Sequence, residues 1–166
     1  MLGYRKTYTL PFKFEIPNYS GDFLKKTSVM KRWLKYIKRY FYIVIKRQNK
    51  LEIFNILPKH KKILWINVSA PSLGDSLMDL SSRLLLKDYK VDLFTDKKNS
   101  ELYKDDFKFS RVITDKNQVV DSKYDLVILD SYSTRSIQAK VKLASLTPFI
   151  GMFGYYNGPE VNRVLF

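Results

Sequence analysis

The stretch Ile63-Leu64-Trp65-Ile66-Asn67-Val68 decides the fold. It is a short apolar run rich in strand-forming residues, which suits a central parallel strand buried on both faces. Further strands are expected at residues 91–94, 111–114, 126–129 and 149–153, and helices at residues 74–86 and 134–146. This alternation predicts right-handed crossovers, and therefore an α/β, Rossmann-like parallel sheet with helices on both faces.

Composition excludes several classes of function. The chain of 166 residues contains no cysteine, which rules out disulfides, thiolate catalysis and cysteine-bound metal sites. Its single histidine, His60, cannot form a metal site by itself, and we expect it to be a solvated linker residue. No apolar run approaches the roughly 20 residues that a transmembrane helix needs, and the N-terminus lacks a signal-peptide core. We therefore expect a cytoplasmic protein.

The net charge of +14 is concentrated at the front of the chain. Residues 1–62 contain 16 Lys and Arg against 3 Asp and Glu (+13), whereas residues 63–166 contain 14 against 13 (+1). We expect a basic arm and helix over residues 1–61, followed by the Rossmann-like domain over residues 62–166. Such asymmetry is typical of a segment with an anionic partner, either nucleic acid or an acidic membrane surface.

The basic segment contains one predicted amphipathic helix, at residues 28–46. Its apolar residues recur at steps of three and four, namely Met30, Trp33, Leu34, Ile37, Phe41 and Val44. The apolar stripe either covers the core of the protein or lies in an anionic membrane interface, and amphipathicity alone does not separate the two. In the membrane interpretation, the protein is peripheral on the inner face of the cytoplasmic membrane, and the contacts are Lys31, Arg32, Trp33, Lys35, Lys38 and Arg39.

Two loops at the carboxyl ends of expected strands are the candidate ligand sites, at residues 69–75 and 130–135. Neither contains the Gly-x-Gly-x-x-Gly of a dinucleotide enzyme or the Gly-Lys-Ser/Thr of a P-loop ATPase. The chain also lacks Asp-x-Asp, which argues against a sugar-nucleotide site built on a metal held by paired aspartates.

The first loop contains Leu73-Gly74-Asp75, and an apolar strand followed by Leu-Gly-Asp resembles the start of glycosyltransferase family 9, the lipopolysaccharide heptosyltransferases. Residues 124–136, Tyr-Asp-Leu-Val-Ile-Leu-Asp-Ser-Tyr-Ser-Thr-Arg-Ser, are similar to the family stretch Tyr-Asp-Leu-Val-Ile-Asp-Leu-Gln-Gly-Asn-Leu-Lys-Ser. Residues 149–154 resemble the strand that follows. The resemblance covers residues 62–154, in the same order and spacing.

The sequence departs from the family pattern at three places. Ser69 stands where the family commonly has arginine, and Ser81 where it commonly has proline. Residues 131–133, Ser-Tyr-Ser, replace Gln-Gly-Asn. We therefore expect a divergent member with a different sugar acceptor.

The resemblance implies a GT-B glycosyltransferase with two facing Rossmann-like domains. The first binds the acceptor, a lipopolysaccharide core or another glycan, and the second binds an ADP-sugar of the ADP-heptose type. Transfer proceeds with inversion and needs no metal or other cofactor. The chain matches the first domain only. We therefore expect a truncated product, which binds ADP-sugar only if a second domain is supplied and has no transfer activity alone.

By the same resemblance, Asp75 is the general base that takes the proton of the attacking acceptor hydroxyl. The adjacent Gly74 leaves room for close approach of a ligand. The residues expected to contact the acceptor are Ser72, Gly74, Ser131, Ser133 and Arg135.

Each of these side chains also has a structural interpretation. Ser72 and Asp75 have the spacing of a capping box, in which the carboxylate only stabilises a helix start. Arg135 either binds an acceptor phosphate or carboxylate or is solvated at a helix start. For Ser131 and Ser133, helix capping is the favoured alternative to sugar binding.

A rival function remains for the front of the chain, as a non-catalytic module that binds nucleic acid or an anionic membrane. Its interleaved aromatic and basic residues suit stacking and phosphate contacts. No nucleic-acid-binding motif is present, however, so nucleic acid is the less favoured partner.

Overall fold

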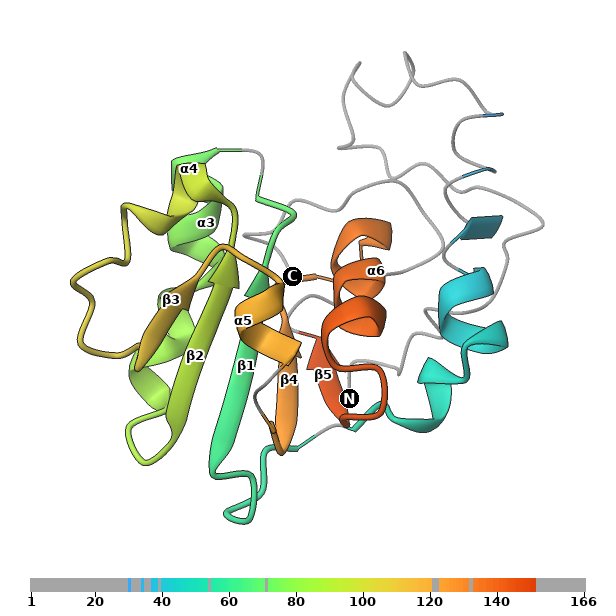
Figure 1. Ribbon diagram of the computed structural model, residues 1–166, viewed down its shortest axis with the longest axis horizontal. Coiled ribbons are helices and arrows are strands. Elements are labelled where there is room, and N and C mark those ends of the chain that lie inside the picture. The colour runs from blue at the N-terminus through green and yellow to red at the C-terminus, as the bar shows by residue number, and fades with distance from the viewer. Residues whose placement is uncertain are drawn as a thin grey trace, which may run out of the picture.

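The computed structural model describes residues 30, 34, 37, 38, 40–53, 55–70, 72–120, 123–131 and 133–151. Its centre is a five-stranded sheet in the order β3-β2-β1-β4-β5, and all neighbouring strands are parallel. The strands are β1 (Lys62–Asn67), β2 (Lys90–Thr95), β3 (Arg111–Ile113), β4 (Leu126–Leu129) and β5 (Phe149–Gly151). The predicted α/β, Rossmann-like sheet is therefore confirmed (Figure 1).

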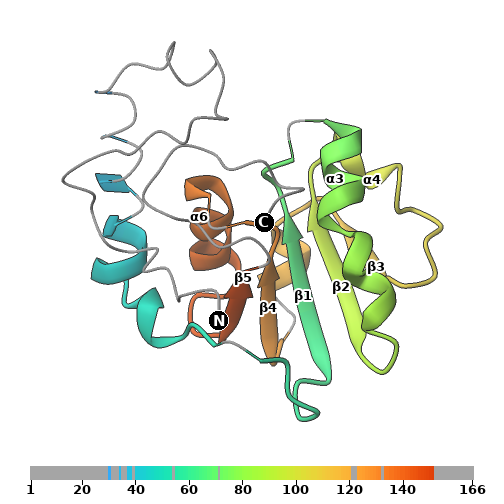
Figure 2. The same cartoon turned by 180° about the vertical axis from the view of Figure 1, so that it is seen from behind.

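Helices cover both faces of this sheet. They are α3 (Leu73–Asp79), α4 (Lys97–Ser100), α5 (Asn117–Val120) and α6 (Thr134–Leu143), with the 3-10 helices η2 (Gln48–Lys50) and η3 (Ser81–Leu85) and the π-helix η1 (Phe41–Ile45). Figures 1 and 2 show α3 and η3 on one face, and α5 and α6 on the other. The short helices α4 and α5 were not expected from the sequence.

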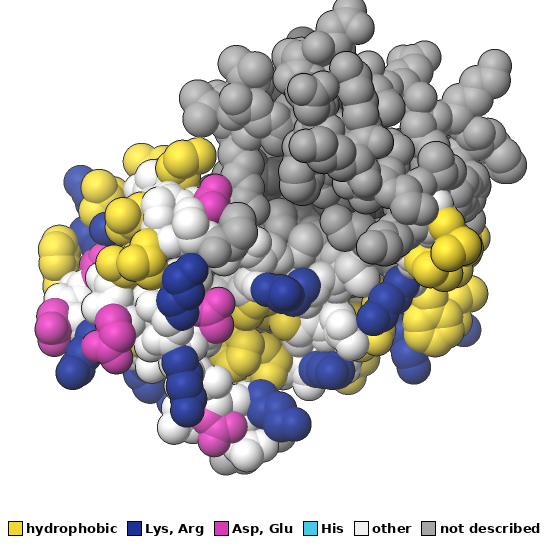
Figure 3. Space-filling model, turned by 90° about the horizontal axis from the view of Figure 1, so that it is seen from above, with side chains coloured by type: hydrophobic (Ala, Val, Ile, Leu, Met, Phe, Trp, Pro, Cys, Tyr) yellow, Lys and Arg dark blue, Asp and Glu magenta, His cyan; other side chains and the backbone are white. Residues whose placement is uncertain are grey.

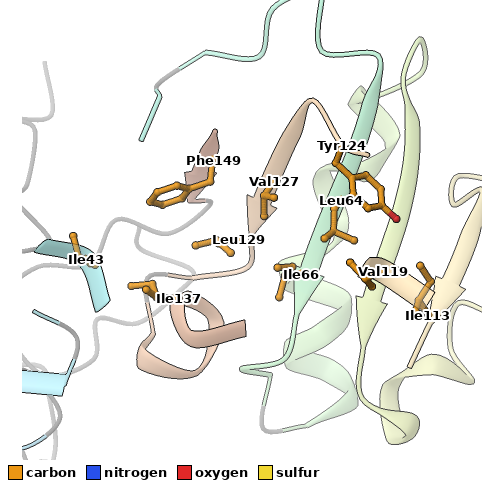
Figure 4. Close-up of a cluster of buried hydrophobic side chains, with 10 residues drawn as sticks. All are labelled: Ile43, Leu64, Ile66, Ile113, Val119, Tyr124, Val127, Leu129, Ile137 and Phe149. Atoms are coloured by element: carbon orange, nitrogen blue, oxygen red, sulfur yellow. The ribbon is translucent and has the colours of Figure 1, made fainter. Parts of the chain in front are cut away.

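The side chains of β1 alternate between two buried cores. Ile63 and Trp65 belong to the core on the side of α3. Leu64 and Ile66 belong to the core under α6, which Figure 4 shows. Every residue of β1 after Lys62 is buried. Burial on both faces is the arrangement expected of a central strand in a parallel sheet.

The helix expected at residues 74–86 is interrupted. The α-helical part ends at Asp79, and residues 81–85 continue as the 3-10 helix η3. The Ser81 hydroxyl donates a hydrogen bond to the Met78 carbonyl oxygen at 2.8 Å. Serine side chains that bond the backbone compete with regular helical hydrogen bonding, which accounts for the break at this residue.

The chain before β1 shares the core of the sheet domain. Ile43 in η1 is fully buried in the same cluster as Ile137 and Phe149. The Phe149 N–H donates to the Leu51 carbonyl oxygen, and the Ile53 N–H donates to the Phe149 carbonyl oxygen, both at 2.9 Å. The segment from η1 to Ile53 therefore packs against α6 and the outer strand β5.

The prediction that His60 is solvated is wrong. The side chain is only 5% exposed, and its Nδ1 accepts a hydrogen bond from the Leu57 N–H at 3.1 Å. The His60 N–H in turn donates to the Leu57 carbonyl oxygen at 2.9 Å. These two reciprocal bonds close a tight turn before β1, and the turn buries the ring.

Lys140 is buried in the core with only 1% of its surface exposed, and lysine is a residue that is rarely buried. Its Nζ donates to the Gln48 side-chain oxygen and to the Ser145 carbonyl oxygen, and it lies 5.1 Å from the centre of the Phe149 ring. Burial lowers the pKa of the Lys140 amine to about 7. Its hydrogen bond to Gln48 joins α6 to η2. Because its pKa is lowered, the amine is largely neutral at alkaline pH.

This burial predicts a pH dependence of stability. The folded pKa of about 7 lies below the ordinary value of 10.5, so between these values the unfolded state binds more protons. Raising the pH through this window should stabilise the fold by up to ~1.4 kcal/mol per pH unit. Urea unfolding of the wild type and of Lys140→Met between pH 7 and 10 should show this contribution only in the wild type.

Lys142→Met is the matched control, since Lys142 is exposed on the same helix. It should keep the wild-type slope. Equal slopes for Lys140→Met and Lys142→Met would contradict the assignment of a depressed pKa to Lys140.

Candidate functional site

The strand order places a topological switch point between β1 and β4. The chain passes from β1 outward to β2 and β3, then returns to β4 on the other side of β1. Because the helices that follow β1 and β4 lie on opposite faces, the loops after these strands separate at the carboxyl edge of the sheet (Figures 1 and 2). Ligands bind at such a point in open α/β sheets.

A buried carboxylate, Asp130, holds the two loops together. It directly follows β4 and is fully buried. Its Oδ2 accepts hydrogen bonds from the backbone N–H groups of Val68 at 3.0 Å and Ser69 at 2.8 Å. Its Oδ1 accepts from the hydroxyl of Ser136 in α6. One side chain therefore bonds the loop after β1 and the first turn of α6.

Three serine hydroxyls continue this link. The Ser69 hydroxyl is hydrogen-bonded to the Ser133 hydroxyl and, at 2.6 Å, to the Ser136 hydroxyl. The Ser133 and Ser136 hydroxyls are 3.0 Å apart. Ser69 thus bonds directly to the start of α6.

The start of α6 carries three of the predicted acceptor-binding residues. Ser133 is the N-cap, and its hydroxyl accepts the Ser136 N–H at 3.1 Å. Ser131 is buried. Its hydroxyl donates a hydrogen bond to the Asp130 Oδ1 and accepts one from the Ser133 N–H, both at 3.4 Å. Arg135 is exposed, and its guanidinium donates to the Val68 carbonyl oxygen at 3.1 Å. Of the three, Arg135 presents the most side chain to solvent.

The start of α3 carries the other predicted residues. Ser72 is the N-cap, and its hydroxyl accepts the Asp75 N–H at 3.2 Å and donates to the Asp75 Oδ2 at 2.6 Å. Asp75 is half-buried, while Ser72 and Gly74 are exposed. A Cβ added at Gly74 would meet only the Ser72 Oγ, at 3.9 Å. Packing within the chain therefore does not require glycine at position 74.

A buried polar cluster fixes α3 beneath Asp75. The Ser76 hydroxyl donates to the Asn67 side-chain oxygen at 2.8 Å and is hydrogen-bonded to the Tyr103 hydroxyl at 3.0 Å. The Asn67 amide donates to Asp79 at 3.3 Å. Burial raises the pKa of Tyr103, which keeps its hydroxyl protonated. The helix that carries Asp75 is thereby tied to the end of β1.

The arrangement offers acid–base and anion-binding groups but no hydrolase triad. Asp75 supplies a carboxylate at the edge of the sheet, and Arg135 supplies a guanidinium. The only histidine of the chain, His60, lies in the turn before β1 and therefore at the opposite, amino edge of the sheet. It is thus too far from the serine cluster to act as its general base.

The structure brings the predicted residues into two groups at one edge of the sheet. Ser72, Gly74 and Asp75 follow β1, whereas Ser131, Ser133 and Arg135 follow β4, and these two strands are paired. Sequence reasoning missed the three residues that link the groups, which are Ser69, Asp130 and Ser136. The one available signal was the acidic residue directly after the apolar run 126–129.

Of the predicted membrane contacts, only Lys38 is among the described residues, and it is exposed. Lys31, Arg32, Trp33, Lys35 and Arg39 lie outside them.

Comparisons of the chain with protein-family models, with curated proteins and with solved structures found no match. Within the described residues, no helix has both the length and the apolar character needed to cross a membrane. The same part of the chain contains no group of three or more acidic or histidine side chains placed to hold a metal ion.

The Asp130 clamp predicts a large loss of stability on substitution. Asp130→Ala leaves two backbone N–H groups and the Ser136 hydroxyl without their acceptor, and should lower the free energy of unfolding by about 3 kcal/mol. Urea denaturation measures this loss. Hydrogen exchange should show faster exchange at the Val68 and Ser69 amides.

Asp125→Ala is the matched control, because the exposed Asp125 carboxylate accepts one backbone N–H, from Lys62 at 2.9 Å. Its loss should stay below about 1 kcal/mol. Similar losses for the two variants would show that Asp130 does not clamp the loops.

Proposed function

We propose that the chain is the acceptor-binding domain of a glycosyltransferase resembling the heptosyltransferases. Such an enzyme transfers a sugar from an ADP-sugar to a lipopolysaccharide core or another glycan, with inversion. One observation carries the proposal: the half-buried Asp75 and the exposed Arg135 follow paired parallel strands at the switch point of the sheet. The Leu73-Gly74-Asp75 motif and the stretch 124–136 supply the link to this reaction.

Asp75 suits the role of general base. Its Oδ2 is oriented by the Ser72 hydroxyl at 2.6 Å. A carboxylate held in this way can accept the proton of an acceptor hydroxyl as that oxygen attacks the anomeric carbon, which typically accelerates transfer by ~10²- to 10⁴-fold. Capping of α3 does not by itself exclude base catalysis by the same carboxylate.

Arg135 suits the binding of an anionic group on the acceptor. Its guanidinium is positioned by the Val68 carbonyl oxygen and is exposed at the start of α6. A guanidinium presents five N–H donors in a planar fork that matches phosphate and carboxylate. A phosphorylated inner-core sugar has this chemistry.

The donor sugar belongs to a second domain in this proposal. We infer that the ADP-sugar is bound by a nucleotide-sugar domain and not by residues 62–166, and that transfer requires both domains but no metal. With an ADP-sugar as donor, the proposed location of the protein is the cytoplasm.

The proposal predicts acceptor binding without donor binding. An NMR titration of the purified chain with a phosphorylated lipopolysaccharide inner-core oligosaccharide should shift the amides at the starts of α3 and α6, whereas ADP-sugar should shift none. Arg135→Ala should weaken binding of the oligosaccharide by about 10-fold, because a charge-assisted hydrogen bond is lost. Lys142→Ala, which removes an exposed charge at the other end of α6, should leave binding unchanged. Binding of neither ligand would refute the proposal.

Gly74 and Asp75 allow a separate test of the motif. Gly74→Ala should stabilise the fold or leave it unchanged, since the added Cβ meets no close atom and alanine favours a helix. The same methyl group should weaken acceptor binding if the sugar approaches the backbone here. Asp75→Asn should keep the fold and abolish transfer when a donor domain is present. Full transfer by Asp75→Asn would rule out the general-base role.

A further inference from the structure

A row of exposed apolar side chains runs along the segment that ends in η1. Residues 30, 34, 37, 38 and 40 are helical, and the π-helix η1 follows directly. The row consists of Met30, Leu34, Ile37, Phe41 and Ile45, and each is between 46% and 69% exposed. Steps of four, three, four and four residues place these side chains on one face of a helix.

This row, the exposed stripe, is distinct from the face that packs on the domain. Ile43 is fully buried against α6 and β5, and Val44 packs against the same core. Ile43 lies on the opposite side of the helix from Phe41 and Ile45, since successive residues are about 100° apart. The stripe is therefore left over after the segment has made its contact with the core.

The segment that carries the stripe is strongly basic. Residues 23–51 contain ten Lys and Arg and no Asp or Glu. Among the described residues, Lys38, Lys46, Arg47 and Lys50 are exposed, and the Lys46 amine lies 5.9 Å from the centre of the Phe41 ring. Figure 3 shows hydrophobic side chains gathered over this side of the molecule with Lys and Arg beside them.

We propose that the exposed stripe binds the surface of an anionic lipid bilayer. Over the 15 residue steps from Met30 to Ile45 an ideal α-helix would rise roughly 22 Å, and side chains on one face of such a helix fit a flat partner. An interfacial helix buries its apolar side chains at the boundary between headgroups and acyl chains, while neighbouring Lys and Arg contact anionic headgroups. Nucleic acid would match the charge but would leave the stripe in water. This inference stands independently of the proposed function.

Co-sedimentation of the full chain with vesicles tests the proposal. Vesicles containing phosphatidylglycerol should bind the chain, and pure phosphatidylcholine vesicles should bind it at least about 10-fold more weakly, because each basic residue near the surface adds to the attraction. Raising the salt concentration should weaken binding to the anionic vesicles. Equal binding to both compositions, or no binding to either, would overturn the proposal.

Paired variants identify the surface. Leu34→Ser with Ile37→Ser should reduce vesicle binding at least about 10-fold, since two apolar side chains that the bilayer would bury are lost. Leu85→Ser with Leu146→Ser removes two apolar side chains outside the stripe that are even more exposed, and should leave binding intact. Lys38→Gln with Lys46→Gln should reduce both binding and its salt dependence.

Two further outcomes distinguish other partners. If the chain forms a dimer in analytical ultracentrifugation and the Leu34, Ile37 double variant is monomeric, the stripe is an interface between copies and the membrane proposal fails. If oligonucleotides bind more tightly than anionic vesicles at matched salt, and the double variant binds them unchanged, the proposal also fails.

Discussion

The burial of β1 on both faces is the constraint on which the rest of the structure depends. Its residues after Lys62 alternate between two hydrophobic cores, so β1 can only be a central strand. It pairs with β2 on one side and with β4 on the other. Parallel neighbours on both sides require crossovers on both faces, and these crossovers create the switch point. The site therefore lies at the end of β1 because of the apolar pattern of β1.

Some of the polar residues at that end of β1 stabilise the loops, whereas others are accessible to solvent. Asp130 and the hydroxyls of Ser69, Ser133 and Ser136 bond to each other and to backbone groups, so they fix the loops after β1 and β4. Asp75 is half-buried and Arg135 is exposed, and both follow strands that end at this edge. A site of this kind benefits from a supported outer layer, because groups that bind a ligand must be held in place by groups that do not.

The sequence predicted the sheet well because strand burial is a local property. The runs at 91–94 and 126–129 are apolar by themselves, and both became strands within a residue of their expected bounds. The four-residue helices α4 and α5 are too short to show a 3.6-residue period, so no pattern could indicate them. The Asp130 clamp joins residues about 60 positions apart, and such pairing follows only from the folded topology.

For the predicted amphipathic helix, the periodicity of apolar residues does not distinguish core packing from membrane contact. Both interpretations, core packing and membrane contact, need apolar residues at steps of three and four. The structure divides these residues, since Val44 packs on the core beside Ile43 while Leu34, Ile37 and Phe41 are exposed. A helix with apolar side chains on two faces has more apolar surface than one contact with the core can bury. The excess apolar surface on the outer face lies within a run of 29 residues that has no acidic side chain, and this combination suits an anionic partner with an apolar layer.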